Sequence, residues 1–321
     1  MDSASLADAW PILTAEERME GFNLLGRVDA EAFFLGLGTR EQVQILESLL
    51  PAERRSWMRL LAPDDAADVL QEAPDDLRTE LMSLLDSPAR LEVSALLAYE
   101  EDEAGGLMNP RYLRVRPEMT VDEALLYIRK QALQGIQIVN YAYALDAQSR
   151  LLGVVSSREL FVSPSERLVH EVMKTDMFTV SEETDQEAVA KLLAEHDLLS
   201  IPVLDAEGRM KGIITVDDVV DVLQEEATED IQKMGGTEAL DAPYLEVGFG
   251  TMVRKRGGWL AVLFLGEMLT ATAMGYFEHE IARALVLMLF VPLIISSGGN
   301  SGSQATTLVI RAMALGEVRL R

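Results

Sequence analysis

The sequence SIPVLDAEGRMKGIITVDDV at residues 200–219 decides the fold, because a related stretch, YAYALDAQSRLLGVVSSREL, stands 59 residues earlier at 141–160. Both stretches read as a strand, a polar turn, a second strand and the start of a helix capped by a hydroxyl residue. The expected strands are 141–145 and 152–155 in the first copy, and 200–204 and 212–215 in the second. The sequence therefore predicts a tandem α/β repeat in the middle of the chain.

Each copy of the repeat extends upstream into a further helix. Runs that begin at Met108 and Met173 each carry a Thr followed three residues later by Glu, which is the pattern of a helix capping box. The two pairs are Thr120 with Glu123, and Thr184 with Glu187. We place the first repeat at 105–165 and the second at 166–223.

Residues 1–104 form an acidic region with helical patterning. Four prolines precede short segments with apolar residues at helical spacing, and acidic residues follow three of them; the prolines are Pro51, Pro63, Pro74 and Pro88. Proline suits the first position of a helix, and carboxylates favour the positive end of the helix dipole. The pattern predicts a stack of short helices, which is typical of an interaction or regulatory surface and has no catalytic signature.

The charge balance excludes several classes of protein. There are 28 Lys and Arg against 53 Asp and Glu, and no Cys. This excludes a disulfide scaffold, a thiolate zinc site, a cysteine nucleophile and nucleic-acid binding through a basic surface. The charge is also uneven, because residues 254–321 hold seven basic and four acidic residues, which leaves a net charge of −28 on residues 1–253.

The basic C-terminal part, 254–321, contains two long apolar stretches. They run from 259 to 276 and from 284 to about 295, the second continuing through small and polar residues to 313. Each is long enough for a tilted membrane helix; a buried helical hairpin in a soluble domain is the alternative. The basic residues lie outside the pair of stretches except for Arg283 in the connection, so the positive-inside rule predicts a multi-pass inner (cell) membrane protein with its N-terminal domains in the cytoplasm. No signal peptide is expected, because residues 1–10 contain acids and lack an apolar core.

The segment from Asp217 to Asp230 contains seven acidic residues and no basic one. On a helix, one face would carry Asp218, Asp221, Glu225 and Glu229. Like charges at this spacing cost about 0.2–0.5 kcal/mol per pair, so the face opposes its own helix unless cations bind it. A solvated helix side is one interpretation and divalent-cation binding is the other. Because the candidate ligands are all oxygens, the pattern favours Mg²⁺ over zinc or copper.

Together these features resemble the MgtE-type magnesium transporters. The motifs that carry the resemblance are YEEDEAGGLM at 99–108, ITVDDV at 214–219, EATEDI at 226–231 and GGNSGSQ at 298–304. The resemblance implies a multidomain fold: an all-α N-terminal superhelical domain, an α/β tandem CBS pair, an acidic connecting (plug) helix and linker at 218–253, and an α-helical transmembrane segment. It also implies a homodimer.

The resemblance further implies the positions of a Mg²⁺ sensor. The implied metal ligands are Asp64, Asp68, Gly106, Asp185, Glu187, the carbonyl of Ala194, Asp197, Asp218, Asp221, Glu226, Glu229 and Asp230. CBS clefts often bind adenine nucleotides through an acid after the last strand, which makes ATP a candidate cofactor beside Mg²⁺. The candidate acids are Glu159, Asp217 and Asp218.

The run GGNSGSQ places small and polar residues at the depth of the membrane, which suits either tight helix packing or a wet pathway. The resemblance implies a pore-lining helix in which Asn300 contacts hydrated Mg²⁺. Glu267 lies in the first apolar stretch, where it is either functional or a polar contact between subunits.

The function that we predict is Mg²⁺ transport gated by cytoplasmic Mg²⁺. At low Mg²⁺ the acidic domains repel one another, and at high Mg²⁺ bound ions bridge them and fix the connecting helix beneath the membrane part. The alternative is a membrane-anchored Mg²⁺-sensing regulatory subunit, or a truncated form, without its own pore, since the family is expected to continue for three further membrane helices. An enzyme is disfavoured because no catalytic domain remains. The expected partners are a second copy of the chain, divalent cations and the membrane, and no nucleic acid.

Overall fold

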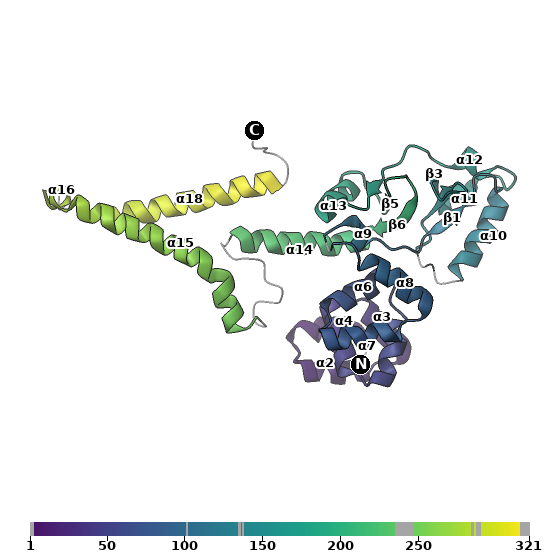
Figure 1. Cartoon of the computed structure of the whole chain (residues 1–321), viewed down its shortest axis with the longest axis horizontal. Coiled ribbons are helices and arrows are strands. Elements are labelled where there is room, and N and C mark those ends of the chain that lie inside the picture. The colour runs from purple at the N-terminus through teal and green to yellow at the C-terminus, as the bar shows by residue number, and fades with distance from the viewer. Residues whose placement is uncertain are drawn as a thin grey trace. The chain divides into compact units, whose positions relative to one another are not determined.

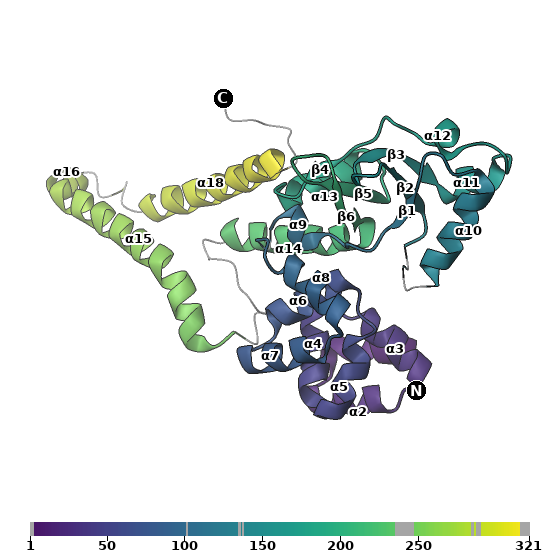
Figure 2. The same ribbon diagram turned by 45° about the vertical axis from the view of Figure 1, so that its right-hand side comes forward.

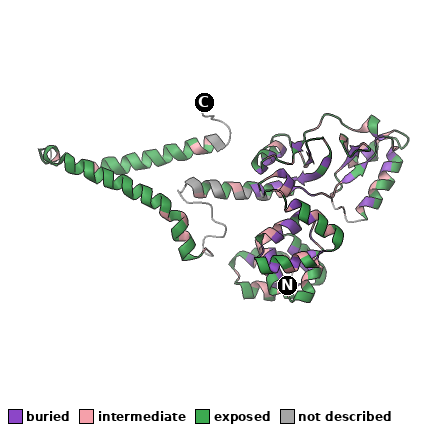
Figure 3. Ribbon diagram, viewed as in Figure 1, coloured by how far each residue is buried: buried purple, intermediate pink, exposed green. Residues whose placement is uncertain are grey.

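The computed structural model describes residues 3–100, 102–133, 136, 138–234, 247–283, 286 and 290–314. The chain divides into two compact units, residues 1–223 and 224–321. The first unit holds a helical domain and two α/β modules (Figure 1). Buried residues gather in this unit, whereas the long helices of the second unit are mostly exposed (Figure 3).

The helical domain is a stack of short helices that repeats every 12 residues. A short α1 (Ser3–Ala9) and a 3₁₀ turn (Trp10–Ile12) come first. The helices of the repeat are α2 (Ala15–Asn23), α3 (Arg27–Leu35), α4 (Thr39–Ser48), α5 (Pro51–Met58), α6 (Pro63–Glu72), α7 (Asp75–Leu84) and α8 (Ser87–Leu96). Pro51 and Pro63 open their helices as predicted, whereas Pro74 is the residue before α7 and Pro88 is the second residue of α8.

A polar side chain at the fourth residue of most of these helices closes the end of the preceding helix. Each donates to the carbonyl oxygen eight residues earlier: Arg18 to Trp10 (3.0 Å), Gln42 to Phe34 (3.0 Å), Arg54 to Leu46 (2.8 Å) and Arg78 to Leu70 (2.6 Å). The last carbonyls of a helix have no partner within the helix, so these donors satisfy them and tie successive helices together.

We expect Arg78→Ala to lower the free energy of unfolding by about 1–3 kcal/mol, because carbonyls at the end of α6 lose their donor. Arg78 donates to Leu70, Gln71 and Ala73. Denaturation followed by the fluorescence of the buried Trp10 and Trp57 tests this. Arg78→Lys keeps the charge but loses the planar fork of donors, so it should lower the free energy of unfolding less than Arg78→Ala does. Equal decreases for the two variants would contradict this explanation.

The two α/β modules are each built on a three-stranded mixed sheet (Figure 2). In both sheets the first strand is parallel to the second and the second is antiparallel to the third. The strands are β1 (Leu113–Val115), β2 (Tyr141–Leu145) and β3 (Leu151–Ser156), and β4 (Val180–Ser181), β5 (Ser200–Leu204) and β6 (Met210–Thr215). The predicted strands 141–145 and 200–204 are confirmed, and β3 and β6 begin one and two residues earlier than predicted.

Short helices flank both sheets: α9 (Ala104–Leu107), α10 (Val121–Ala132), α11 (Ser157–Val162), α12 (Val169–Val172) and α13 (Gln186–Glu195). Thr120 and Glu123 form the predicted capping box of α10. The prediction that Thr184 caps α13 is wrong. Asp185 is the cap instead, because its carboxylate accepts hydrogen bonds from the N–H groups of Glu187 and Ala188 and so satisfies two free donors of the helix.

Helix α14 (Val216–Met234) follows β6 directly, and the second unit contains α15 (Phe249–Tyr276), α16 (Glu278–Arg283) and α18 (Val291–Ala314). Within the described ranges, α15 is the one helix that is long and apolar enough to cross a membrane. It contains the first predicted apolar stretch and starts earlier, at Phe249. Of the second stretch, residues 284–285 and 287–289 lie outside the described residues, and the small polar run lies in α18.

Candidate functional site

An acidic cavity of about 220 Å³ lies between the helical domain and the second α/β module. Four carboxylates line it: Asp64 and Asp65 from the first turn of α6, and Asp217 and Asp218 from the first turn of α14. The other polar lining residues are Arg59, Asn109, Arg111 and Thr215. Two of the predicted metal ligands, Asp64 and Asp218, are thus brought together from elements more than 150 residues apart in sequence.

Asp64 is the most unusual group in the acidic cavity. Its residue is only 7% exposed, and its Oδ1 atom has no hydrogen-bond partner within the described part of the chain. Burial raises the pKa of Asp64 well above its usual value, and the nearby charges of Asp65 and Asp218 raise it further. A buried carboxylate oxygen without a donor is costly, and a bound cation would remove that cost.

Asp218 faces the same cavity and is held in place by Thr215. The Thr215 N–H and hydroxyl donate to Asp218 Oδ2 at 3.0 and 2.8 Å. Burial raises the pKa of Asp218 to about 6, and Asp217 and Asp65 act in the same direction, although the two bonds from Thr215 oppose the shift. The cavity therefore concentrates negative charge that is only partly compensated by hydrogen bonds.

The raised pKa of Asp218 predicts a pH-dependent difference between the wild type and Asp218→Asn without Mg²⁺. The wild-type folded state favours the protonated form of Asp218. The stability that this protonated form contributes is fully present below the ordinary pKa of 3.8 and is lost as pH rises through about 6. Asn stays neutral, so the variant should be more stable than the wild type at pH 7, by about 1–3 kcal/mol, and the gap should close near pH 4. Denaturation in a chelator measures it; a gap independent of pH would contradict the argument.

The other predicted metal ligands do not all meet in the acidic cavity. Asp68 lies one turn further along α6 and is partly buried. Glu226 lies on α14 and is also partly buried, whereas the side chains of Asp221, Glu229 and Asp230 fall outside the described residues. Across the described ranges, no group of three or more acidic or His side chains is placed to hold an ion by direct ligation. An ion in the acidic cavity would therefore keep much of its water, as Mg²⁺ does.

The ligands predicted around α13 lie at its two ends. Asp185 and Glu187 lie at the start of the helix. A backbone bridge between Glu103 and Asp185 places them beside α9, the helix that contains Gly106. Ala194 and Asp197 lie at the other end, about 13 Å away by the rise of an α-helix. One ion cannot contact both ends, so these residues form two separate candidate positions.

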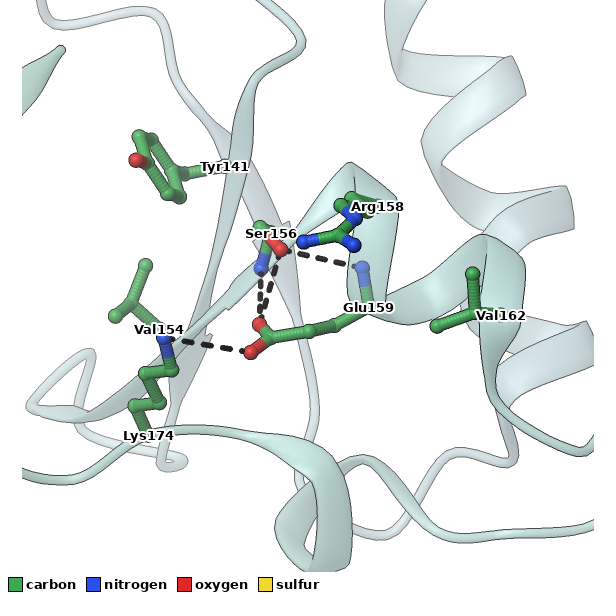
Figure 4. A pocket seen from close by; sticks show the side chains of 7 residues that line it. All are labelled: Tyr141, Val154, Ser156, Arg158, Glu159, Val162 and Lys174. Atoms are coloured by element: carbon green, nitrogen blue, oxygen red, sulfur yellow. Dashed lines mark hydrogen bonds and ion pairs between the residues drawn. The ribbon is translucent and has the colours of Figure 1, made fainter.

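A second cavity, which we call the basic cleft, lies in the first α/β module. It measures about 390 Å³ and is lined by Tyr141, Val154, Ser156, Arg158, Glu159, Val162 and Lys174 (Figure 4). Its central acid is Glu159, which accepts hydrogen bonds from the Ser156 N–H and hydroxyl, both at 3.0 Å. Lys174 Nζ lies 3.5 Å from the other oxygen of Glu159.

The basic cleft has the groups that a nucleotide requires. Burial alone would raise the pKa of Glu159, but the hydrogen bonds from Ser156 and the charge of Lys174 outweigh it and lower the pKa. The ionised carboxylate can accept hydrogen bonds from ribose hydroxyls, and Arg158 and Lys174 offer cations to phosphate oxygens. Of the predicted nucleotide acids, Glu159 lies here, whereas Asp217 and Asp218 line the acidic cavity.

Asn300 and Glu267, the two residues singled out in the membrane part, lie in α18 and α15, and both are exposed in the second unit. Thr270 and Thr272, near Glu267, donate their hydroxyls to the carbonyls of Gly266 and Met268 in their own helix. These bonds leave the helix regular, so the local structure assigns no role to Glu267.

Sequence reasoning missed several polar residues that line the acidic cavity, among them Arg59, Asp65 and Asn109. Arg59 and Asp65 carry no signal of their own, because acidic and basic residues are common throughout the helical domain. Asn109 does carry a signal, because it follows Met108 in the first copy of the repeat as Lys174 follows Met173 in the second. A comparison of the two copies would have found it.

The fold defines a multidomain protein in which a helical domain and a pair of CBS modules precede a helix long and apolar enough to cross a membrane. Residues 1–102 match the MgtE intracellular N domain, and residues 104–165 and 169–225 match the CBS domain. The chain therefore belongs to the MgtE family of magnesium transporters. The family and fold class predicted from the sequence are confirmed.

Individual relatives agree with this assignment. The magnesium transporter MgtE of Thermus thermophilus is 41% identical over 316 residues, which cover 97% of this chain and 70% of the relative. The transporter of the same name from Enterococcus faecalis is 30% identical over 88% of this chain and 70% of its own length. Proteins of this kind are transporters, in agreement with the expectation that the chain is not an enzyme.

Two solved structures resemble the first unit. The cytosolic domain of the Mg²⁺ channel MgtE in complex with ATP superimposes with a TM-score of 0.64 at 41% identity, over 69% of this chain and 90% of that one. The soluble part of a magnesium transporter superimposes with a TM-score of 0.56 at 25% identity, over 70% of this chain and 98% of that one.

Proposed function

We propose that this chain is a Mg²⁺ transporter or channel gated by Mg²⁺ that binds in its acidic cavity. The observation that carries the proposal is the buried Asp64 Oδ1 atom, which has no partner among the described residues and shares its cavity with Asp65, Asp217 and Asp218. Support also comes from relatives that are named magnesium transporters and from a similar domain that belongs to a Mg²⁺ channel.

The chemistry of the acidic cavity fits Mg²⁺. Its donors are hard carboxylate oxygens, and 220 Å³ leaves room for an ion with part of its water shell. Asp64 and Asp218 would hold the hydrated ion, and Asp68 would extend the site by one helical turn. Because the two acids belong to different domains, an ion between them favours the closed arrangement of those domains.

One ion is not expected to complete the switch. Moving an equilibrium from 1:99 to 99:1 requires about 5.5 kcal/mol of differential binding, which several weak sites can share. We propose as further sites Gly106 with Asp185 and Glu187, Ala194 with Asp197, and the α14 acids Asp221, Glu226, Glu229 and Asp230. In this proposal α14 acts as the plug and Asn300 contacts the transported ion in the pore. The protein would work as a homodimer in the inner (cell) membrane, crossing it more than once, with its acidic domains in the cytoplasm.

The second candidate function is a membrane-anchored Mg²⁺-sensing subunit that has no pore of its own. The observation in its favour is that α15 is the one membrane-length apolar helix within the described ranges. The sensor is the same in both candidates, so transport itself must separate them.

The deciding experiment is Mg²⁺ flux into proteoliposomes that contain only this chain, with low or high Mg²⁺ on the face that carries the acidic domains. Flux that high Mg²⁺ suppresses supports a gated transporter. Absence of flux, together with Mg²⁺-dependent protection of residues 1–223 from protease, supports the sensing subunit. If Mg²⁺ changes neither flux nor protease protection, both candidates are wrong.

We also propose that the basic cleft binds an adenine nucleotide, with Glu159 on the ribose hydroxyls. A similar domain is known in complex with ATP, which supports the proposal. Calorimetric titration of the full chain with ATP tests it. Glu159→Gln should weaken ATP binding about tenfold, because a neutral amide is a poorer acceptor for two hydroxyl donors.

A further inference from the structure

The acidic cavity and the basic cleft occupy equivalent places in the two CBS modules. In each module a hydroxyl residue ends the last strand and donates both its N–H and its hydroxyl to an acid three residues later. The pairs are Ser156 with Glu159, and Thr215 with Asp218. Glu159 and Asp218 are therefore the same structural position, which both copies of the repeat retain.

The floor of each site is equivalent too. Lys174 exchanges two backbone hydrogen bonds with Val154, at 2.8 and 2.9 Å, and Asn109 exchanges two with Ile213, at 2.7 and 3.0 Å. Each residue directly follows a Met, and each has its carbonyl oxygen against a glycine, Gly153 or Gly212. Positions 174 and 109 thus hold the same place beside the equivalent acids Glu159 and Asp218.

The charges at these equivalent positions are opposite. In the basic cleft, Arg158 and the ammonium of Lys174 accompany Glu159, and Lys174 forms an ion pair with it at 3.5 Å. In the acidic cavity, Asp217 replaces the arginine and the neutral Asn109 replaces the lysine. The helical domain then adds Asp64 and Asp65, and the cations that line this cavity are Arg59 and Arg111, of which Arg111 is paired with Glu92 at 2.7 Å. The first acid has a built-in counter-ion at this position and the second has none.

We infer that positions 174 and 109 determine which class of ligand each CBS module takes. Lys174 neutralises Glu159 and leaves the basic cleft with excess positive charge, which selects a ligand that carries phosphate. Asn109 leaves Asp218 without an ammonium, so a divalent cation takes the place that Lys174 fills in the other module. This inference rests on the proposed function and adds the residues that set the specificity of its two sites.

A lysine at position 109 has room to act in this way. Asn109 is buried, but its side chain lines the acidic cavity and its Oδ1 accepts only a local hydrogen bond from the Arg111 N–H, at 2.8 Å, among the interactions described for that atom. The cavity that faces it contains the carboxylates of both domains. An ammonium there would act as a cation that is part of the chain.

The first test is Asn109→Lys in the full chain in nanodiscs, with trypsin digestion of residues 1–223 as the readout. Asn109→Met has a similar length without the charge and measures the effect of losing the amide. We expect Asn109→Lys to be protected in a chelator, where the wild type and Asn109→Met are digested. We also expect its response to Mg²⁺ to be at least about tenfold weaker than that of Asn109→Met.

The second test does not depend on the folding of a buried variant, because the side chain of Lys174 is 69% exposed. Lys174→Met should lower the affinity for ATP at least about tenfold more than the affinity for adenosine, since only ATP carries phosphates. Calorimetry with both ligands measures this difference.

The outcomes separate this inference from the function on which it rests. If the wild type shows Mg²⁺-dependent protection but Asn109→Lys behaves like Asn109→Met, the inference is wrong for the acidic cavity and the proposed sensor stands. If Lys174→Met weakens ATP and adenosine equally, it is wrong for the basic cleft. A wild type that responds neither to Mg²⁺ nor to ATP would overturn the proposed function and this inference together.

Discussion

Asp64→Asn is expected to need at least about tenfold more Mg²⁺ than the wild type to protect residues 1–223 from protease, and Asp64→Asn with Asp218→Asn about a hundredfold more. Both acids line one cavity, and Asp64 Oδ1 has no other partner among the described residues. Each substitution removes one negative charge from the residues that surround the bound ion. Protease protection as a function of Mg²⁺ concentration measures the shift.

The same variants should be more stable than the wild type in a chelator. Burial and mutual repulsion disfavour the ionised forms of Asp64 and Asp218, as the raised pKa values of both indicate. A neutral amide removes that repulsion. Weaker Mg²⁺ binding with higher Mg²⁺-free stability is the signature of a charge site, because a residue with a purely structural role would lose stability in both conditions.

The matched control for this prediction is Asp76→Asn. Asp76 is the second residue of α7, as Asp64 is of α6, so both occupy the same place in the 12-residue repeat. Asp76 is exposed and lies outside the lining of the acidic cavity. We expect the Mg²⁺ response of Asp76→Asn to equal that of the wild type. If Asp64→Asn and Asp76→Asn shift the required Mg²⁺ concentration equally, the Mg²⁺ response depends on the overall charge of the domain and not on the acidic cavity.

Much of the fold could be predicted from the sequence because its signals are local. The strands at 141–145 and 200–204 were found to the residue, since alternating apolar side chains and a polar turn define them within a few positions. The 12-residue step of the helical domain was missed because the prolines marked it imperfectly: Pro74 and Pro88 stand one residue to either side of the first residues of α7 and α8.

The candidate site was predicted less completely because it depends on how domains pack. The resemblance to a known family named Asp64 and Asp218, but the burial of Asp64, and the absence of a hydrogen-bond partner for its Oδ1 atom among the described residues, depend on tertiary packing. Asp185 illustrates the converse: an acid chosen as a metal ligand is also a helix cap with two backbone donors. Its carboxylate is therefore less in need of an ion than that of Asp64.

Gly212→Ala is expected to lower the free energy of unfolding by more than about 2 kcal/mol, because the new Cβ would clash with neighbouring atoms that cannot easily move. That atom would lie 2.8 Å from the carbonyl oxygen of Asn109 and 2.9 Å from two side-chain atoms of Met108. The carbonyl belongs to backbone that is hydrogen-bonded to Ile213, so it cannot move without breaking that pairing. Denaturation followed by the fluorescence of Trp10 and Trp57 measures the loss.

Gly153→Ala makes the parallel change in the first module, where the new Cβ would lie 2.8 Å from the carbonyl oxygen of Lys174 and 2.7 Å from the sulfur of Met173. Gly36→Ala is the control, because its nearest neighbour would be at an ordinary 3.5 Å. Beyond stability, the two glycine variants should differ in function. Gly212→Ala displaces position 109 and should impair the Mg²⁺ response, whereas Gly153→Ala displaces position 174 and should impair ATP binding. Equal damage to both responses by either variant would mean that the two modules act as one unit, and the separate specificities assigned to them would have to be abandoned.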